Sequence, residues 1–264
     1  MTRSDGIDEA TISKLPPGVA LSWGIVKQPS RGPKGELSVK KIVDAAIAIA
    51  DRDGLAAVSM SRVAQSLGFT TMSLYRYIAS KEALLVLMQD AVCTIPIPPE
   101  EPGKPWRQEM GEYVWACIAV FRDHPWLGDI PITGVPLTPS NLYVIDWILR
   151  IMRDFPLNDF EKMSFLLLLS SYARACGMIA RDMDRAIREG ASPETFSGVH
   201  YGDALRQLVK PGRFPYLHPL LMSGAYTDEA DNPIGDDLDF GLQRILDGLE
   251  HYLQLKTSGS GQQK

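Results

Sequence analysis

The feature that most constrains this chain is a tight corner between two short helical segments in residues 59–77. Ser59 is a good helix N-cap, and Gly68 supplies the positive φ that a sharp turn needs. Ala64 is small where the next helix must cross closely, and that helix is predicted over 71–77. Such a pair is typical of a helix-turn-helix, although any three-helix core can contain a helix–glycine–helix corner.

The residues on either side of the corner separate into an inward and an outward set. The inward set holds the short helices against the preceding helix and comprises Val63, Leu67, Phe69 and Leu74. The outward set lies near the start of the third helix and comprises Thr70, Thr71, Met72, Tyr75 and Arg76. A helix of this size fits the major groove of DNA, and its N-terminal residues reach base edges.

Charge is distributed unevenly along the chain, whose formal net charge is −5. The stretch from Lys27 to Lys81 holds nine Lys and Arg residues against four Asp and Glu, a net of +5, which leaves −10 for the remainder. A basic segment on an acidic body indicates one part suited to a polyanion and another part with a different task.

Most of the chain is predicted to be helical, and we find no convincing β-alternation. Ser38 caps an apolar-periodic run that ends at Gly54, and Ser80 caps another that continues to about Thr94. Prolines between 96 and 105 then forbid continuous helix. Further helices are expected over 106–123, 138–154, 159–189 and 237–255, with another start at Ser192-Pro193-Glu194.

Two regions resist this reading. Residues 1–36 are rich in Pro, Gly and Ser and are predicted to form a mostly flexible arm. The apolar island 21–26 within it either docks on the body or is mobile. The stretch 195–233 is rich in Gly, Pro and Tyr, and the sequence predicts no clear structure for it.

The sequence contains none of the common enzyme signatures. It has no Gly-x-Ser-x-Gly, no phosphate loop and no His or Cys spacing suited to a metal, so we expect no catalytic residues, metal or cofactor. The three cysteines are far apart and are predicted to be buried free thiols. With no signal peptide and no uncharged run of membrane-spanning length, we expect a cytoplasmic protein that does not enter a membrane.

The segment from Ile42 to about Met88 resembles the DNA-binding domain of the tetracycline-repressor (TetR) family. The residues that match are Ile42-Val-Asp-Ala-Ala, Asp53-Gly54-Leu55, Ser59-Met60, Val63-Ala64, Leu67-Gly68, Leu74-Tyr75-Arg76-Tyr77 and Lys81-Glu82-Ala83-Leu84-Leu85. The Leu-Tyr-x-Tyr-x-x-x-Lys segment is the most specific part. Residues 239–250 also resemble the last helix of the tetracycline-repressor-like subgroup.

The resemblance implies an all-α fold with an N-terminal three-helix DNA-binding domain and a larger helical C-terminal domain. We expect a flexible arm over 1–36, a helix-turn-helix domain over 37–82, an effector-binding and dimerisation domain over 83–256 and a disordered tail over 257–264. By the same resemblance, the chain pairs as a homodimer through the 159–189 and 237–255 helices.

Roles for individual residues follow from the matched positions. Base contacts are implied for Thr70, Thr71, Met72 and Tyr75, with Arg76 contacting a base or a phosphate. Phosphate contacts are implied for Ser59, Arg62, Ser73, Tyr77 and Lys81. Tyr77 has an alternative role as a ring that braces the helix. In the arm, Lys34 is a candidate for phosphate or minor-groove contact, together with Lys27 and Arg31, unless the arm is simply solvated.

The C-terminal part offers aromatic residues at helical spacing that either line an effector cavity or form ordinary core. The cavity candidates are Trp115, Trp126, Tyr143, Trp147, Phe165 and Tyr172. On the 159–189 helix, Arg174 and Arg181 pair with acids, face the dimer partner or anchor an anionic effector, in that order of expectation.

The function these observations favour is a dimeric bacterial regulator that binds an inverted-repeat DNA operator. By the resemblance, it is a repressor that a small molecule, unidentified by the sequence, releases from DNA. Two alternatives remain open: a regulator whose ligand promotes binding or activates the target, and a helical carrier or enzyme that keeps a vestigial helix-turn-helix.

Overall fold

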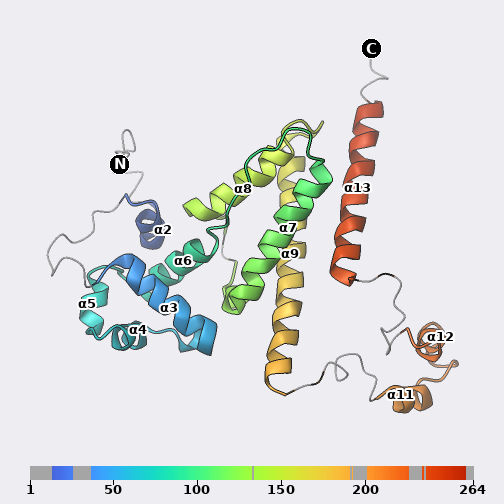
Figure 1. The fold of residues 1–264 in the computed structure, drawn as a ribbon, viewed down its shortest axis with the longest axis horizontal. Coiled ribbons are helices and arrows are strands. Elements are labelled where there is room, and N and C mark those ends of the chain that lie inside the picture. The colour runs from blue at the N-terminus through green and yellow to red at the C-terminus, as the bar shows by residue number, and fades with distance from the viewer. Residues whose placement is uncertain are drawn as a thin grey trace. The chain divides into compact units, whose positions relative to one another are not determined.

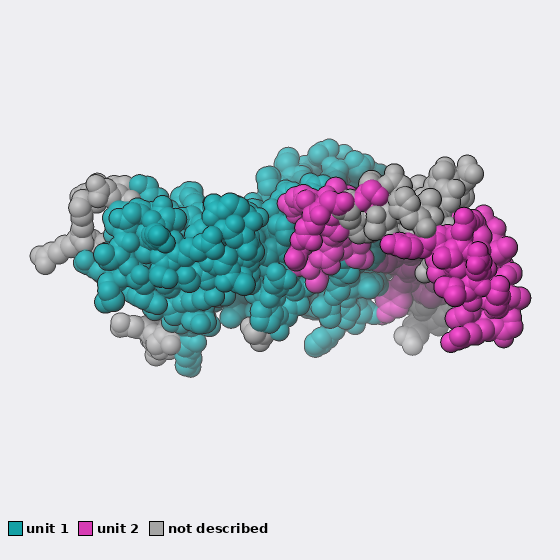
Figure 2. All heavy atoms as spheres, turned by 90° about the horizontal axis from the view of Figure 1, so that it is seen from below, with its two compact units in different colours: residues 1–177 teal, residues 178–264 magenta. Residues whose placement is uncertain are grey.

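A computed structural model describes residues 14–25, 37–132, 134–190, 192, 201–225, 234 and 236–259, and every regular element within these ranges is helical. The expected all-α fold class is therefore confirmed. The chain forms two compact units, Met1–Gly177 and Met178–Lys264 (Figure 2). The division lies inside helix α9 (Asp159–Arg188).

Four helices build the N-terminal part of the first unit (Figure 1): α3 (Val39–Asp53), α4 (Met60–Ser66), α5 (Thr71–Tyr75) and α6 (Lys81–Val92). A 3₁₀ turn, η1 (Leu55–Ala57), joins α3 to α4. Each of the four α-helices starts at a hydroxyl that accepts a backbone N–H. The sequence predicts three of these caps, Ser38, Ser59 and Ser80, and the structure adds Thr70 at the start of α5. The turns after α3 and α4 place Gly54 at φ 81° and Gly68 at φ 74°, where a Cβ would be strained.

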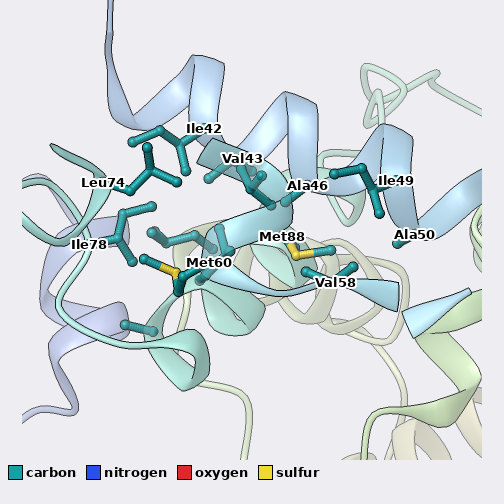
Figure 3. Packing of buried hydrophobic residues seen from close by; sticks show 14 of the residues in the cluster. Ile42, Val43, Ala46, Ile49, Ala50, Val58, Met60, Leu74, Ile78 and Met88 are labelled. Atoms are coloured by element: carbon teal, nitrogen blue, oxygen red, sulfur yellow. The ribbon is translucent and has the colours of Figure 1, made fainter. Parts of the chain in front are cut away.

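One buried apolar cluster holds these helices together (Figure 3). Ile42 of α3 lies beside Leu74 of α5 and Ile78, and all three are fully buried. Ala46, further along α3, is also fully buried. Leu84, Leu87 and Met88 extend the same cluster onto α6, because Lys81–Val92 presents them at helical spacing. The helix-turn-helix is therefore packed on α3 and α6 by one continuous core.

The predicted flexible arm contains a short helix, α2 (Pro17–Ser22), which packs against α6. Pro17 lies in its first turn, where a missing N–H costs nothing, and Gly18, Val19 and Ala20 are buried. Leu21, the first residue of the apolar island 21–26, also packs against the buried cluster, so the start of the island is docked on the body of the chain. The other residues of the arm between 26 and 36, Lys34 included, lie outside the described ranges.

The remaining helices of the first unit follow the proline-rich segment: α7 (Trp106–Asp123), the 3₁₀ turn η2 (Pro125–Asp129), α8 (Pro139–Ile151) and the first part of α9. Tyr113 of α7 and Trp147 of α8 meet edge to face, with ring centroids 5.5 Å apart. Gly177 lies so close to Phe121 that a Cβ has no room, so α9 crosses α7 in close contact (Figure 1).

The second unit contains α11 (Gly202–Leu208), α12 (Leu217–Met222) and α13 (Asp237–Gly259). The first two give helical structure to part of the 195–233 stretch that the sequence left unassigned. Helix α13 begins where the pattern predicts, since the Asp236 carboxylate accepts N–H groups of Leu238 and Asp239 at 2.8 and 3.2 Å. The predicted start at Ser192-Pro193-Glu194 falls mostly outside the described residues.

Within the described ranges, α9 is the one helix that passes a length-and-composition test for crossing a membrane, with a mean hydropathy of 1.4. Only 22% of the most apolar 18-residue stretch of α9 is buried. The exposed apolar residues of this helix include Phe160, Leu167 and Ile179, at 86%, 65% and 54% exposure. Core and interface helices of soluble proteins pass the same test. An exposed apolar stripe of this kind marks an interaction surface.

The core predicts a sharp contrast between two neighbours on α5. Leu74→Ala removes a fully buried side chain and should lower the free energy of unfolding by about 2–5 kcal/mol. Met72→Ala changes a side chain that is 73% exposed and should alter it by no more than about 0.5 kcal/mol. Urea unfolding followed by circular dichroism at fixed protein concentration measures both, and equal effects would contradict this packing.

Candidate nucleic-acid interface

Helix α5 turns one side to the core and the other to solvent. Leu74 is its one buried residue, whereas Met72 is 73% and Tyr75 44% exposed. Arg76, the C-cap of α5, is exposed and forms no ion pair with any described residue. An apolar thioether, an aromatic ring and an exposed guanidinium thus share the solvent side of this helix, as the sequence predicts.

Two residues with expected DNA contacts have a structural task at the start of α5. Thr70 Oγ1 accepts the N–H of Ser73 at 3.3 Å and lies 2.9 Å from the Ser73 hydroxyl. Thr70 is exposed and Thr71 is half-buried. The two hydroxyls are therefore oriented by each other, and a base or phosphate would meet a pair whose geometry is already set.

The start of α4 shows a similar local arrangement. Ser59 Oγ accepts the Arg62 N–H at 3.2 Å and lies 3.1 Å from the Ser61 hydroxyl. The Arg62 guanidinium binds Asp53 at 2.5 Å, and the same carboxylate accepts from Arg52 at 2.9 Å. The hydrogen bond from Arg52 lowers the pKa of the Asp53 carboxyl, and the charges of both arginines act in the same direction. Asp53 therefore stays ionised and orients Arg62.

The remaining candidates differ in their surroundings. Tyr77 is half-buried and packs against the apolar cluster, which favours its alternative role as a brace. Lys81 begins α6 and is half-buried. Lys34 lies outside the described residues. The structure thus brings Ser59, Arg62, Thr70, Ser73 and Arg76 together on the two short helices and their caps, but it gives Tyr77 a packing role.

In the part of the chain that the structure describes, no group of three His, Cys, Asp or Glu side chains is placed to hold a metal ion. The surface of α4 and α5 offers hydrogen-bond donors, hydroxyls and apolar side chains. Such groups recognise phosphate oxygens and base edges.

A second connection, besides the continuous α6, joins the helix-turn-helix to the rest of the unit. Asp51, near the end of α3, accepts the Trp126 Nε1–H at 2.6 Å and lies 2.9 Å from His124 Nδ1. Trp126 and Leu127, on η2, are 2% and 4% exposed and belong to the same apolar cluster as the core of α3 to α6. Trp126, a cavity candidate in the sequence, is thus placed in that core.

Arg174 of α9 binds the backbone at the C-terminal end of η2. Its Nη2 donates to the carbonyl oxygens of Gly128 at 2.6 Å and Ile130 at 3.3 Å, and its guanidinium lies 5.7 Å from the Phe121 ring centroid. The sequence suggested an acid, a partner subunit or an anionic effector for Arg174, whereas it binds backbone. Arg181 pairs with Asp182 at 2.8 Å, the first of the expected alternatives.

The other cavity candidates differ in their exposure to solvent. Trp147 is 3% exposed and meets Tyr113 edge to face, whereas Trp115 and Tyr143 are 37% and 66% exposed. Phe165 and Tyr172 are half-buried on α9. Sequence reasoning missed Tyr113, although it shares a helical face with Met110, Val114 and Cys117 of α7.

Two cysteine thiols lie in this region, Cys117 beside Tyr113 and Cys93 near Cys117. Burial raises the pKa of Cys117 to about 12, and burial together with the nearby Cys117 and Asp90 raises that of Cys93 to about 12. Both remain neutral at physiological pH. Cys93 and Cys117 are half-buried, whereas the third free thiol, Cys176, is buried as the sequence predicts. This interior is apolar with a few polar atoms, which is the composition of small-molecule sites in proteins.

Two family models match the chain. Residues 42–88 match the model described as "Bacterial regulatory proteins, tetR family", and residues 98–253 match "Tetracyclin repressor-like, C-terminal domain". A curated relative, the HTH-type transcriptional repressor DrrR1 of Streptomyces coeruleorubidus, is 35% identical over 234 residues, which is 87% of this chain and 83% of the relative.

Solved structures with the same fold include ActR of Streptomyces coelicolor. Its apo form is 26% identical with a TM-score of 0.67, and the match covers 84% of this chain and 99% of ActR. ActR in complex with actinorhodin is 27% identical with a TM-score of 0.66, covering 81% of this chain and 96% of that one. A complex of ActR with (S)-DNPA has a TM-score of 0.64 at 27% identity, covering 82% and 98%.

The Asp51 contact predicts a measurable cost. Asp51→Ala leaves the Trp126 indole N–H without its acceptor and should lower the free energy of unfolding by about 1–3 kcal/mol. Asp44→Ala on the same helix removes only a surface pair with Lys40 and should cost no more than about 1 kcal/mol. Urea unfolding compares the two variants, and an equal loss would show that the Trp126 bond contributes little.

Proposed function

This chain belongs to the tetracycline-repressor (TetR) family of bacterial transcription regulators, and on that premise we propose that it is a homodimeric repressor, released from its operator by a small molecule. The observation that supports DNA recognition most directly is the division of α5. Leu74 anchors the helix in the core, while Met72, Tyr75 and Arg76 are presented to solvent. A recognition helix needs both a rigid support and free side chains at the major groove.

Individual contacts follow from this presentation. The exposed Arg76 guanidinium is suited to a guanine or a phosphate, and Met72 offers an apolar contact to a thymine methyl. Thr70, Thr71 and Tyr75 complete the base-reading set, and Ser59, Arg62, Ser73 and Lys81 meet phosphates. Arg62 keeps its ion pair with Asp53 and serves a phosphate from that fixed position.

The dimer forms through the exposed apolar side of α9, with α13 as the second helix of the interface. Phe160, Met163 and Leu167 in the first half of α9 and Ile179, Met183 and Ile187 in its second half are exposed at three- and four-residue spacing. On α13, Phe240 and Leu255 are 42% and 56% exposed. A dimer sets two α5 helices about 34–36 Å apart, one turn of DNA, and so selects an inverted repeat.

The effector enters the helical body between α7, α8 and α9. The ActR complexes with actinorhodin and (S)-DNPA support a small molecule as the ligand class. The buried Tyr113 and Trp147, with the half-buried Cys117, supply apolar walls with few polar atoms. We expect an apolar effector of several rings or methylenes, because such walls reward buried apolar area.

Release requires the body to bias the DNA-binding helices, and two routes are available. Helix α6 is continuous between them, and the η2 connection runs from Arg174 through Gly128 and Trp126 to Asp51 of α3. An effector that favours a shape of the body in which η2 is shifted moves α3 and the core beneath α5. Its influence equals its differential affinity for the two shapes.

A regulator that binds DNA only with its ligand, or that activates its target, would use the same DNA-binding helices and effector site. In the ligand-dependent case the effector would raise the affinity for the operator instead of lowering it. A carrier or an enzyme would not need an exposed arginine at the end of α5. A regulator of this kind acts in the cytoplasm, where the DNA is.

The first experiment is selection of random duplexes by the purified full-length protein, followed by sequencing and binding at several salt concentrations. Enrichment of an inverted repeat, with affinity that falls steeply as salt rises, is the expected result. Absence of enrichment at low salt, from protein shown to be a folded dimer, would count against an effector-free repressor.

Arg76→Glu should weaken binding to the selected operator at least about 30-fold, since a dimer loses two contacts worth about 1–3 kcal/mol each. Lys210→Glu makes the same charge change at an exposed residue of the second unit, outside the matched DNA-binding segment, and should leave affinity within about twofold. Fluorescence anisotropy measures both. Comparable losses in the two variants would indicate a non-specific charge effect rather than recognition by α5.

Titration of actinorhodin into the operator complex tests release by a small molecule. We expect a lower operator affinity, with actinorhodin binding more weakly to the DNA-bound protein by the same factor, because coupling is reciprocal. Tighter operator binding would favour the ligand-dependent alternative. If actinorhodin binds the protein and leaves operator affinity unchanged, the proposed coupling fails for this ligand.

A further inference from the structure

Helix α2 lies outside both segments that match the family models, yet it is packed closely on the helix that links DNA binding to the body. A Cβ on Gly18 would lie 2.9 Å from the Ala83 Cα, 2.9 Å from the Ala83 carbonyl oxygen and 2.9 Å from the Val86 Cβ. Gly18 therefore allows the backbone of α2 to touch the backbone of α6. Val19 and Ala20, each 4% exposed, complete the contact.

The other end of α2 reaches a different part of the body. The Trp23 indole N–H donates to the carbonyl oxygen of Leu137 at 2.8 Å, across 114 residues of sequence. Leu137 stands two residues before α8. Trp23 itself is 46% exposed, so this hydrogen bond rather than burial of the ring ties the end of α2 to that position.

The start of α8 is also tied to the far end of α6. Asp90 Oδ1 accepts the Ser140 N–H at 2.9 Å, and the Thr94 and Ser140 hydroxyls lie 3.0 Å apart. Helix α6 thus meets α8 through Asp90 near its C-terminal end and meets α2 through Ala83 near its N-terminal end. Trp23 then joins α2 back to the residues before α8, which closes a ring of contacts.

We propose that α2 is a strap that fixes the orientation of α6 relative to α8 and thereby pre-organises the DNA-binding helices for the operator. A pivot of α6 on the body carries α2 with it, because Gly18 and Ala83 are in backbone contact, and so must break the single Trp23–Leu137 bond. The strap limits the orientations of α5 in the free protein. Binding to the operator then costs less conformational entropy, so the affinity for DNA is higher. This effect on DNA rests on the proposed function, whereas the strap itself does not.

Three substitutions in the full-length protein test the strap. Trp23→Phe keeps a ring and removes the donor, and Gly18→Ala inserts a methyl against the Ala83 backbone, so that α2 must shift. Ser22→Ala is the control within α2, because that hydroxyl donates to the Val19 carbonyl of its own helix. Gly111→Ala is the control for the added methyl, since nothing lies within 4 Å of its Cβ position on α7.

The first readout is hydrogen–deuterium exchange of the free protein, which needs neither operator nor effector. Gly18→Ala should speed exchange of the amides in α6, and Trp23→Phe should speed exchange in residues 137–142, with both controls unchanged. The thermal midpoint identifies any general loss of stability. If both test variants exchange like their controls, α2 is not a strap.

The second readout is affinity for the selected operator. Trp23→Phe should weaken binding about twofold to tenfold, the value of one net hydrogen bond, and leave the slope of log affinity against log salt unchanged. An altered slope would mean that α2 contacts phosphate directly, and unchanged or tighter binding would mean that the strap does not favour the operator-binding orientation; either result overturns the proposal. If the wild-type protein binds no operator, the proposed function fails while hydrogen exchange still decides the strap.

Discussion

The contact between Leu74 and the apolar cluster on α3 and α6 is the constraint on which recognition depends. Helix α5 has five residues, too short to be stable alone, and Leu74 is its one buried side chain. Packing against Ile42 and Ile78 therefore holds the helix and sets the direction in which Met72, Tyr75 and Arg76 point (Figure 3). The same cluster includes Trp126 and Leu127 of η2, so the DNA-binding helices and the body share one core.

The sequence predicted the parts whose signals are local. Caps at Ser38, Ser59 and Ser80 and the positive φ of Gly68 follow from short-range chemistry, and each has the predicted place in the fold. The exposed side of α5 was predictable for the same reason. What sequence reasoning missed depends on contacts between distant residues. Arg174 binds the backbone of η2 and Trp126 packs in the DNA-binding core, and neither has a signal in its own neighbourhood.

Helix α2 illustrates the same limit in another way. Its six residues include a proline and a glycine, which are typical of a flexible arm, and six residues are too few to show a periodic pattern. Gly18 is informative only once Ala83 is known to lie against it. A glycine that suggests mobility in the sequence is here the residue that permits the closest packing.

The attachment of Arg174 to η2 has an evolutionary consequence. Its two acceptors are the carbonyl oxygens of residues 128 and 130, which every amino acid possesses, so the side chains at these positions are not needed for the contact. Relatives can thus diverge along this turn, adapting it to new ligands, without losing the attachment to α9. The attachment requires only that the arginine is kept and that the main chain follows the same path.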